Sequence, residues 1–478
     1  MRFQIPSVVA ALVLPLTAVA LPANTVEEVP AHLRGKRSFV VRDGVERTIF
    51  EHEASGATID FVTNSGICET TPGVNQYSGY VSVGSNQNMW FWFFEARHNA
   101  STAPLAAWFN GGPGCSSMIG LFQENGPCQF YDGASTPSLN PYSFNEYANM
   151  IYIDQPIGAG FSYGTETVTS TATAAPFVYA LLQAFYANFP QYENRDFGIF
   201  TESYGGHYGP EFASYFQAQN KKSGTIEVPL VALGINNAWL DPAINYKSFI
   251  DYAYNNTYKP LISNSQFNSL TTYFNNKCLP ALKKCTGLTG TDKACIQADN
   301  ICEQIEGTIL NAADFDAYDV RQPYQDPYPP ETYVKYLSNA AVTKAIGAKS
   351  EYAECSNSAG DKFNTGGDDA RSLLSTLSEV VQTGISVLIW AGDADWICNW
   401  FGNIITAEAV TYSQSAAFKA KAVADYTVNG VAKGTFKNVG NLNWLRVFGA
   451  GHEVMYYQPE VSLQVFKQIM QKEAISST

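Results

Sequence analysis

The chain has 478 residues, 46% of them hydrophobic and 15% charged, and a formal net charge of −14 at pH 7. This length fits two or three average domains or one large α/β domain with an insertion, and the apolar content is enough for a sizeable core. The acidic balance argues against nucleic acid and anionic membranes as partners.

Residues 1–20 have the pattern of a secretory signal peptide. Arg2 provides a positive start, the apolar run VVAALVLPLTAVA follows, and Ala18-Val19-Ala20 forms a small-residue cleavage site. The run is too short for a membrane anchor and contains Pro15. We therefore predict a secreted protein, with an acidic vacuolar or lysosome-like compartment as the alternative.

Residues 21–54 are polar and contain the dibasic pair Lys36-Arg37. They are either a short propeptide cut at that pair, which would make the protein a zymogen, or a surface arm. In both cases we expect the folded core to begin near residue 55.

Six short apolar segments, each bounded by Gly, Asn or Asp, predict the strands of a sheet. Each has the length of a strand and is apolar on both faces, which is typical of a parallel sheet covered by helices. The segments are PLAAWFNGG, NMIYIDQP, DFGIFTESYGG, PLVALGINN, ISVLIWAGD and NWLRVFGAGH.

Two other segments complete the predicted core. QYSGYVSVGSNQNMWFWFFEAR alternates around a Gly-Ser-Asn turn, which predicts an antiparallel hairpin. AAPFVYALLQAFYANFP repeats apolar residues every four positions, which predicts a helix packed on the sheet. The alternation of strands and helices favours a doubly wound α/β fold.

Residues 240–375 break this pattern, because they are rich in Tyr, Asn and Cys and the strand-like segments stop before them and resume after them. We predict an inserted helical cap there, between the two parts of the core at residues 55–239 and 376–478.

The nine cysteines indicate a disulfide framework with one cysteine left over, because the chain is predicted to be secreted. The near-symmetric spacing of Cys278, Cys285, Cys295 and Cys302 suggests nested pairs. No C-x-x-C pattern supports a zinc site, and we expect no metal or cofactor. Asn99 and Asn255 begin glycosylation sequons.

TESYGGHY, residues 201–208, raises the possibility of a catalytic serine. A hydrolytic elbow reads Gly-x-Ser-x-Gly, and here Gly205 follows Ser203 at the right distance while Thr201 replaces the first glycine. A serine nucleophile needs a histidine base. Of the five histidines, His452 is the best candidate, because it ends an apolar strand, where α/β sheets carry their active sites.

The remaining catalytic groups follow from chain order. The carboxylate should lie between the serine and the histidine in the chain. Asp393 and Asp395 both follow a predicted strand there, and spacing alone does not decide between them. An oxyanion hole needs backbone N–H donors, and the glycine pair in WFNGGPGCSS together with the amide of Tyr204 can provide them.

Four motifs in this order, WFNGGPGCSS, TESYGGHY, AGDADWICNW and GAGHE, resemble the serine carboxypeptidase family, and most closely its fungal secreted members. The resemblance covers essentially the whole chain after residue 54. It implies an α/β-hydrolase fold, with a mostly parallel central sheet, helices on both faces and a disulfide-stapled cap. It also implies the removal of single residues from peptide C-termini.

The resemblance implies a role for each site residue. The catalytic residues would be Ser203, Asp395 and His452, and the oxyanion donors the amides of Gly112 and Tyr204. The substrate's free carboxylate would be held by Asn110, Gly111 and Glu202, with Glu124 behind Glu202 and Trp108 alongside. Cys398 and Glu453 would line the pocket for the leaving residue.

The family's cysteine pattern implies the pairs Cys115–Cys355, Cys278–Cys302 and Cys285–Cys295, with Cys398 free. Cys68–Cys128 follows by elimination. The sequence departs from the commonest family pattern at Thr201, Gly205 and Met455, but no catalytic group is lost.

Two other classes of function remain as alternatives. A secreted esterase or acyltransferase would use the triad without a carboxylate clamp, and a binding protein on a hydrolase fold would not need the triad. A zinc carboxypeptidase is disfavoured because H-E-x-x-H is absent. We expect peptides with a free C-terminal carboxylate as substrates, no nucleic-acid or membrane partner, and a monomer or dimer.

Overall fold

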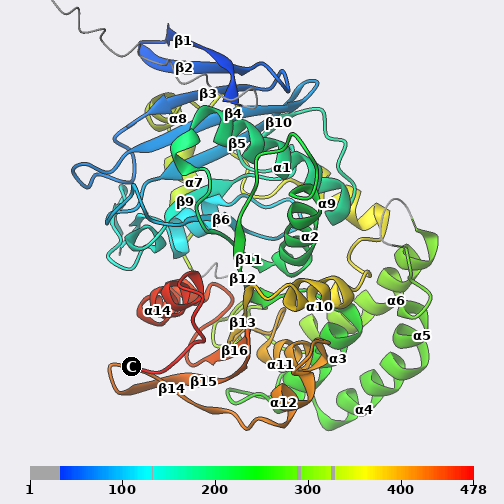
Figure 1. Ribbon diagram of the computed structural model, residues 1–478. Helices are drawn as coiled ribbons and strands as arrows, with labels where there is room; N and C mark the ends of the chain where they lie inside the picture. The colour runs from blue at the N-terminus through cyan, green and yellow to red at the C-terminus, as the bar shows by residue number, and fades with distance from the viewer. Residues whose placement is uncertain (1–32, 132, 288–291, 325–328) are drawn as a thin grey trace, which may run out of the picture.

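A mixed 14-stranded sheet runs through the molecule in the order β1-β2-β3-β4-β5-β9-β6-β11-β12-β13-β16-β15-β14, with β10 beside β5 (Figure 1). The computed structural model describes residues 33–131, 133–287, 292–324 and 329–478. The predicted signal peptide lies outside these ranges. Within them, no helix is long and apolar enough to cross a membrane.

The six predicted apolar segments all form strands, and the strands are adjacent and parallel, as predicted. β9, β6 and β13 are buried along their whole length, because helices cover both faces of this part of the sheet. The strands are β9 (Asn149–Ile153), β6 (Leu105–Phe109), β11 (Phe197–Ser203), β12 (Leu230–Ala238), β13 (Ser386–Gly392) and β16 (Leu442–Val447).

Antiparallel strands extend the sheet on both sides. The predicted hairpin is confirmed as β4 (Gln76–Gly84) and β5 (Gln87–Phe94). The other flanking strands are β1 (Gly35–Arg42), β2 (Val45–His52), β3 (Thr58–Thr63), β14 (Ala424–Val428) and β15 (Val431–Val439). Short pieces are β7 (Cys128–Gln129), β8 (Ser138–Leu139) and β10 (Tyr163–Gly164).

β1 and β2 belong to the segment interpreted as a propeptide or a surface arm. Both strands are paired into the main sheet, and Arg37 donates from Nη2 to Asn188. The dibasic pair therefore lies within β1. Cleavage of this segment stays a prediction.

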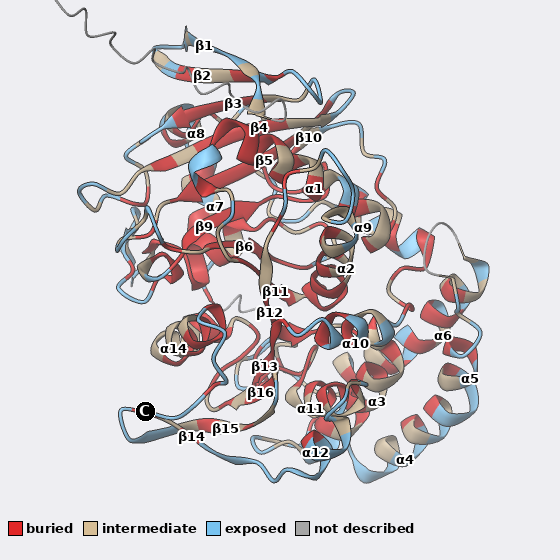
Figure 2. Ribbon diagram, in the orientation of Figure 1, coloured by how far each residue is buried: buried red, intermediate tan, exposed pale blue. Residues whose placement is uncertain are grey.

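Helices pack on both faces of the sheet and bury two apolar clusters against it (Figure 2). One face is covered by α1 (Thr171–Asn188), α2 (Gly205–Gln219), α10 (Leu374–Gln382) and α11 (Trp400–Ala409). The other face is covered by α14 (Pro459–Met470). α1 contains all but the last two residues of the predicted helix and starts at a capping box between Ser170 and Thr173.

The insertion occupies the connection between β12 and β13, and it has two parts rather than the single cap that we predicted. α3 to α6 form a lobe with its own apolar core, at the lower right of Figure 1. α8 lies at the other end of the molecule, where Ser78 on β4 donates to Ile346 O and Arg47 on β2 donates to Gly347 O. The helices of the insertion are α3 (Pro242–Asn255), α4 (Asn264–Tyr273), α5 (Leu279–Leu282), α6 (Lys293–Leu310), α7 (Thr332–Leu337), α8 (Ala340–Ile346) and α9 (Asn357–Gly366). Outside the insertion, α12 (Ser415–Ala420) lies between β13 and β14, and α13 (Val454–Tyr457) follows β16.

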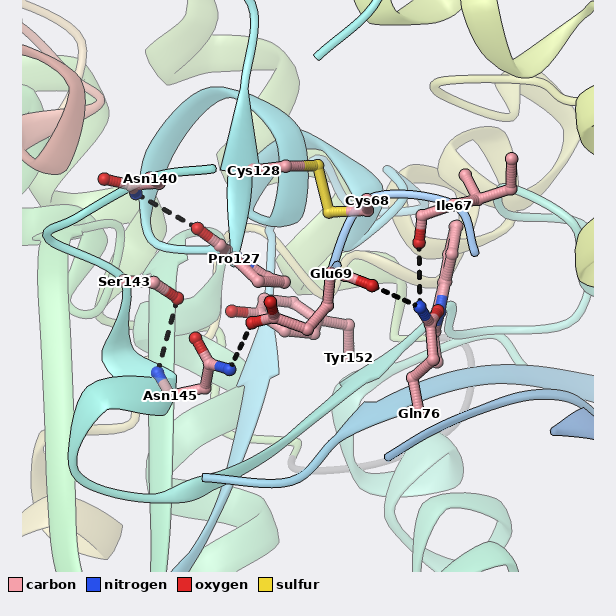
Figure 3. Close-up of a disulfide and its surroundings, with 12 residues drawn as sticks. Ile67, Cys68, Glu69, Gln76, Pro127, Cys128, Asn140, Ser143, Asn145 and Tyr152 are labelled. Atoms are coloured by element: carbon pink, nitrogen blue, oxygen red, sulfur yellow. Dashed lines mark hydrogen bonds between the residues drawn. A yellow bond between two sulfur atoms is a disulfide. The ribbon is translucent and has the colours of Figure 1, made fainter. Parts of the chain in front are cut away.

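The structure has four disulfides, in the pairing that the sequence analysis expected: Cys68–Cys128, Cys115–Cys355, Cys278–Cys302 and Cys285–Cys295. The last two lie within the α3–α6 lobe. Figure 3 shows how Cys68–Cys128 ties the β3–β4 connection to β7. Next to it, Gln76 donates to the carbonyls of Ile67 and Glu69, and Asn145 donates to the Glu69 carboxylate. The disulfide and these hydrogen bonds hold the chain at Cys128, just after Glu124.

Candidate active site

Ser203 ends β11 at a sharp turn into α2. Its φ of 62° is rare for a residue with a side chain, and such strained positions cluster at functional sites. Two glycines fit closely around the turn. Within the turn, a Cβ on Gly205 would lie 2.5 Å from Thr201 Cβ, and in the loop after β6, a Cβ on Gly111 would lie 2.4 Å from Tyr204 N. The backbone is held by the bond from Trp239 N to Ser203 O, at 2.9 Å.

His452 and Asp395 are in direct contact next to this turn. His452 Nδ1 lies 3.0 Å from Asp395 Oδ2. Because Nδ1 faces the carboxylate, Nε2 is the ring nitrogen left for Ser203, which lines the same cavity as His452. Burial lowers the pKa of His452, but the charges of Asp395 and Glu202 outweigh it and raise this pKa above its ordinary value.

Asp395 is held by a set of donors that the sequence analysis missed in part. Asn237, at the end of β12, donates from Nδ2 to Asp395 Oδ2 at 2.6 Å, and the amides of Ile397 and Cys398 donate at 3.2 and 3.1 Å. Asn237 has a φ of 38°, an unusual backbone conformation that no local sequence pattern indicated.

Asp393, the alternative carboxylate, has other partners. It accepts hydrogen bonds from Arg446 Nη2 at 3.1 Å, from Gly449 N at 2.8 Å and from the Tyr258 hydroxyl at 2.5 Å. Of the two aspartates, Asp395 is therefore the one that contacts the histidine.

The glycine-rich loop after β6 packs against the serine turn. Gly112 has a φ of 107°, which favours glycine, and Cys115 N donates to Gly111 O at 3.1 Å. The disulfide Cys115–Cys355 ties this loop to the insertion. The Gly112 and Tyr204 amides thus belong to two backbone segments in contact at Ser203, the arrangement that an oxyanion hole needs.

Two carboxyl groups share one amide beside the serine. Asn110 Nδ2 lies 3.2 Å from both Glu124 Oε1 and Glu202 Oε1, while Asn110 Oδ1 accepts from Trp108 Nε1 at 2.7 Å. Asn236, which the sequence analysis did not identify, donates to Glu202 Oε2 at 2.7 Å and to His452 O at 2.9 Å.

Burial controls the protonation of this pair. It raises the pKa of Glu124 well above the usual value, and the charges of Glu202 and Glu453 raise it further. Burial also raises the pKa of Glu202, although His452 and the hydrogen bond from Asn236 act in the opposite direction. The cluster therefore holds protons at acid pH.

A cavity of about 520 Å³ opens above Ser203, and acidic side chains line much of it. Glu453 lines it beside His452, and the buried Glu453 Oε2 has no hydrogen-bond partner. Burial, followed by the charges of Glu202 and Glu354, raises the pKa of Glu453 well above its ordinary value. The other acids are Glu306, Asp316, Glu331 and Glu354, which the sequence analysis did not single out.

Of the two residues predicted to line the leaving-residue pocket, Glu453 lines the cavity and Cys398 is not among the lining residues. Cys398 is an unpaired, buried cysteine, and burial and the charge of Asp395 raise the pKa of its thiol. Its backbone N–H bonds to the triad aspartate. Both sequon asparagines, Asn99 and Asn255, are exposed.

The chain is similar to known serine carboxypeptidases. The family model for serine carboxypeptidases matches residues 66–472. Carboxypeptidase S1 of Penicillium janthinellum is 64% identical over 424 residues, which cover 87% of this chain and 100% of the relative. Carboxypeptidase S1 homolog A of Arthroderma otae is 36% identical, with 86% and 76% covered.

A solved structure supports the fold. The prohormone-processing carboxypeptidase Kex1Δp from Saccharomyces cerevisiae superposes with a TM-score of 0.73 at 24% identity, covering 85% of this chain and 93% of that one. The predicted α/β-hydrolase architecture is thereby confirmed. The chain belongs to the serine carboxypeptidase family and is a serine-type carboxypeptidase.

Proposed function

We propose that the enzyme releases single C-terminal residues through an acyl-enzyme formed on Ser203. The observation that carries this proposal is the Asp395–His452 contact, with His452, Ser203 and Glu202 lining one cavity. Glu124 lies behind Glu202, and both carboxyl groups accept from Asn110 Nδ2. Ser203 Oγ attacks the last peptide carbonyl while His452 Nε2 takes its proton. The Gly112 and Tyr204 amides stabilise the oxyanion. His452 then protonates the leaving amine, and water hydrolyses the acyl-enzyme by the reverse proton path.

The paired carboxyl groups account for exopeptidase selectivity. Asn110, the Gly111 amide and the protonated Glu202 donate hydrogen bonds to the substrate's terminal carboxylate, while Glu124 shares the proton and Trp108 holds Asn110. An esterase or acyltransferase, the alternative function, would have no terminal carboxylate to hold at this cluster. The same reasoning favours acid pH, because an ionised Glu202 would repel the substrate.

The leaving residue's side chain points toward Glu453 and Cys398 in this proposal. We further propose that the protein is secreted by way of residues 1–20, with an acidic vacuolar or lysosome-like compartment as the alternative. Residues 21–54 are either a short propeptide cut at Lys36-Arg37 or a surface arm, and Asn99 and Asn255 carry glycans. The enzyme acts as a monomer or dimer.

Mass spectrometry of products from a defined peptide tests the proposed reaction. At acid pH we expect successive loss of single C-terminal residues, and the same peptide with an amidated C-terminus should be cut much more slowly. Internal cleavage, or equal rates for free and amidated peptides together with rapid ester hydrolysis, would favour the esterase alternative.

A further inference from the structure

Another buried carboxylate, that of Asp368, contacts the residue after Ser203 and is not part of the Ser203–Asp395–His452 set. Asp368 follows α9 in the insertion, and both Asp368 and its ion-pair partner Arg371 are buried. Arg371 Nη1 donates to Asp368 Oδ1 at 2.7 Å, and Arg371 Nη2 donates to Gly366 O at 3.1 Å. Burying such an ion pair costs desolvation free energy unless the remaining lone pairs of the carboxylate accept hydrogen bonds.

The second carboxylate oxygen of Asp368 accepts hydrogen bonds from two segments of the core. Thr171, the first residue of α1, donates to Asp368 Oδ2 from its amide at 2.8 Å and from its hydroxyl at 2.6 Å. The Tyr204 hydroxyl donates to the same oxygen at 2.9 Å. One carboxylate therefore joins the insertion, the start of α1 and the serine turn.

Tyr204 is the residue that directly follows Ser203, and its side chain is held along its whole length. Its ring stacks on His207 with centroids 4.7 Å apart and meets Phe363 edge-on at 5.9 Å. His207 is itself bonded from Nδ1 to Trp239 O at 2.6 Å. Burial and the charge of Asp368 raise the pKa of Tyr204 well above its usual value, so the phenol keeps its proton and donates.

We propose that Asp368 is a positioning residue for the oxyanion hole, because it anchors the side chain whose own backbone N–H is one of the two donors. This inference rests on the oxyanion role proposed for the Tyr204 amide. Preorganised donors act only when they are held at the position where charge develops, so a loosened Tyr204 weakens transition-state binding and leaves substrate binding intact.

Tyr204→Phe tests the proposal, because it removes only the hydroxyl. Loss of a whole oxyanion donor costs about 10²–10³ in kcat, and a donor that is retained but loosened should cost about tenfold, with KM within about twofold of wild type. The affinity for a peptide aldehyde, which forms a tetrahedral adduct on Ser203, should fall by about the same factor. The affinity for the matching peptide with a reduced, non-reactive scissile bond should not change.

Tyr192→Phe is the matched control. The Tyr192 hydroxyl is also buried and donates to a carboxylate, Glu95 Oε1, at 2.6 Å, but it does not contact the site. Tyr192→Phe should leave kcat and the affinity for the peptide aldehyde unchanged. Asp368→Asn should lower kcat like Tyr204→Phe, and the double variant should lower it no further than the single variants. If Asp368→Asn does not fold, Tyr204→Phe carries the test alone.

The outcomes separate this inference from the proposed function. A wild type that releases no C-terminal residues would overturn the proposed function itself. An active wild type with Tyr204→Phe at full kcat and full aldehyde affinity would overturn the positioning role alone. A Tyr204→Phe variant that changes KM and the reduced-peptide affinity as much as kcat would also overturn it.

Discussion

We expect catalysis to depend on Ser203, with its strained backbone, and on Asp395 and His452. Ser203→Ala, Asp395→Asn and His452→Ala should each lower kcat by about 10⁴–10⁶, because the three residues act as a unit. Steady-state kinetics on a blocked dipeptide measures this loss. A serine-directed phosphonate should label Ser203 alone in the wild type and nothing in Ser203→Ala, and label on a different serine would contradict the assignment.

The Glu124–Glu202 pair predicts how KM depends on pH. Both pKa values are raised, so the pair loses its proton as the pH rises, and the ionised pair repels a carboxylate. KM for a free-acid peptide should increase with pH, while KM for the same peptide as a C-terminal amide should stay nearly flat. Glu202→Gln should flatten the free-acid curve, and identical pH curves for both substrates in the wild type would refute the clamp.

Glu453 predicts which leaving residues are accepted. Burial raises the pKa of its carboxyl group well above the usual value, and a cationic Arg or Lys side chain would lower this pKa and form an ion pair. Such a pair is worth about 0.2–1 kcal/mol when exposed and more when buried, so the preference should be a few-fold to about tenfold.

Matched acyl-dipeptides ending in Arg or Leu measure this effect. The Arg-to-Leu ratio of kcat/KM should rise with pH in the wild type, because Glu453 ionises, and should be lower and flat in Glu453→Gln. A ratio that the substitution leaves unchanged near neutral pH would remove Glu453 from the specificity argument.

At the scale of elements, the site lies at the carboxyl ends of adjacent strands. The glycine-rich loop follows β6, and Ser203 ends β11. Asn236 and Asn237 are near the end of β12, Asp395 follows β13 and His452 follows β16. The distance between neighbouring strands of the sheet therefore determines how far apart these groups lie.

Gly392, the last residue of β13, shows how closely two of these strand ends approach. A Cβ on Gly392 would lie 2.1 Å from Gly451 O and 2.5 Å from Ala450 O, next to His452. Gly392→Ala should force the segments apart, at a cost of about 1–3 kcal/mol in stability, and lower kcat by loosening Asp395 from His452. Gly307→Ala, where no atom lies within 4 Å of the added Cβ, is the control and should keep full activity. Equal kcat for both variants would show that the contact does not position the triad.

The predictable elements are those with local patterns. Continuous apolar runs identified the six parallel strands, and the motifs located Ser203, His452 and the glycine loop. Asn236 and Asn237 could not be found, because they look like ordinary polar residues at the end of a strand until β12 is placed between β11 and β13. The choice between Asp393 and Asp395, and the split of the insertion, also depend on tertiary contacts.

For the whole molecule, buried acids predict a stability maximum at acid pH. Burial raises the pKa of Asp154 and of Glu306 to about 7, so the folded protein binds more protons than the unfolded chain between about pH 4 and about 7. Stability falls as the pH rises through that window. The pKa of Asp60 is lowered: burial raises it, but hydrogen bonds from Lys349 and Arg47 outweigh burial. That contribution is lost as the pH falls below about 4.

Calorimetry across a pH series measures this profile. Tm should be highest near pH 4–5 and fall by several degrees toward about pH 7. Glu306→Gln should reduce the fall on the neutral side, whereas a Tm that rises steadily from about pH 5 to about pH 7 would contradict the assignment of these buried protons.

The long connection between β12 and β13 has a consequence for how this architecture can change. Asn236 and Trp390 remain paired neighbours although residues 239–385 separate the two strands. Loop-closure entropy grows only with the logarithm of length, about 0.6 kcal/mol for each doubling, so the insertion costs the core about 2 kcal/mol more than a loop of roughly ten residues. Natural selection can therefore enlarge or rebuild the walls of the substrate cavity at small thermodynamic cost, while the strand register that aligns the serine, aspartate and histidine is inherited unchanged.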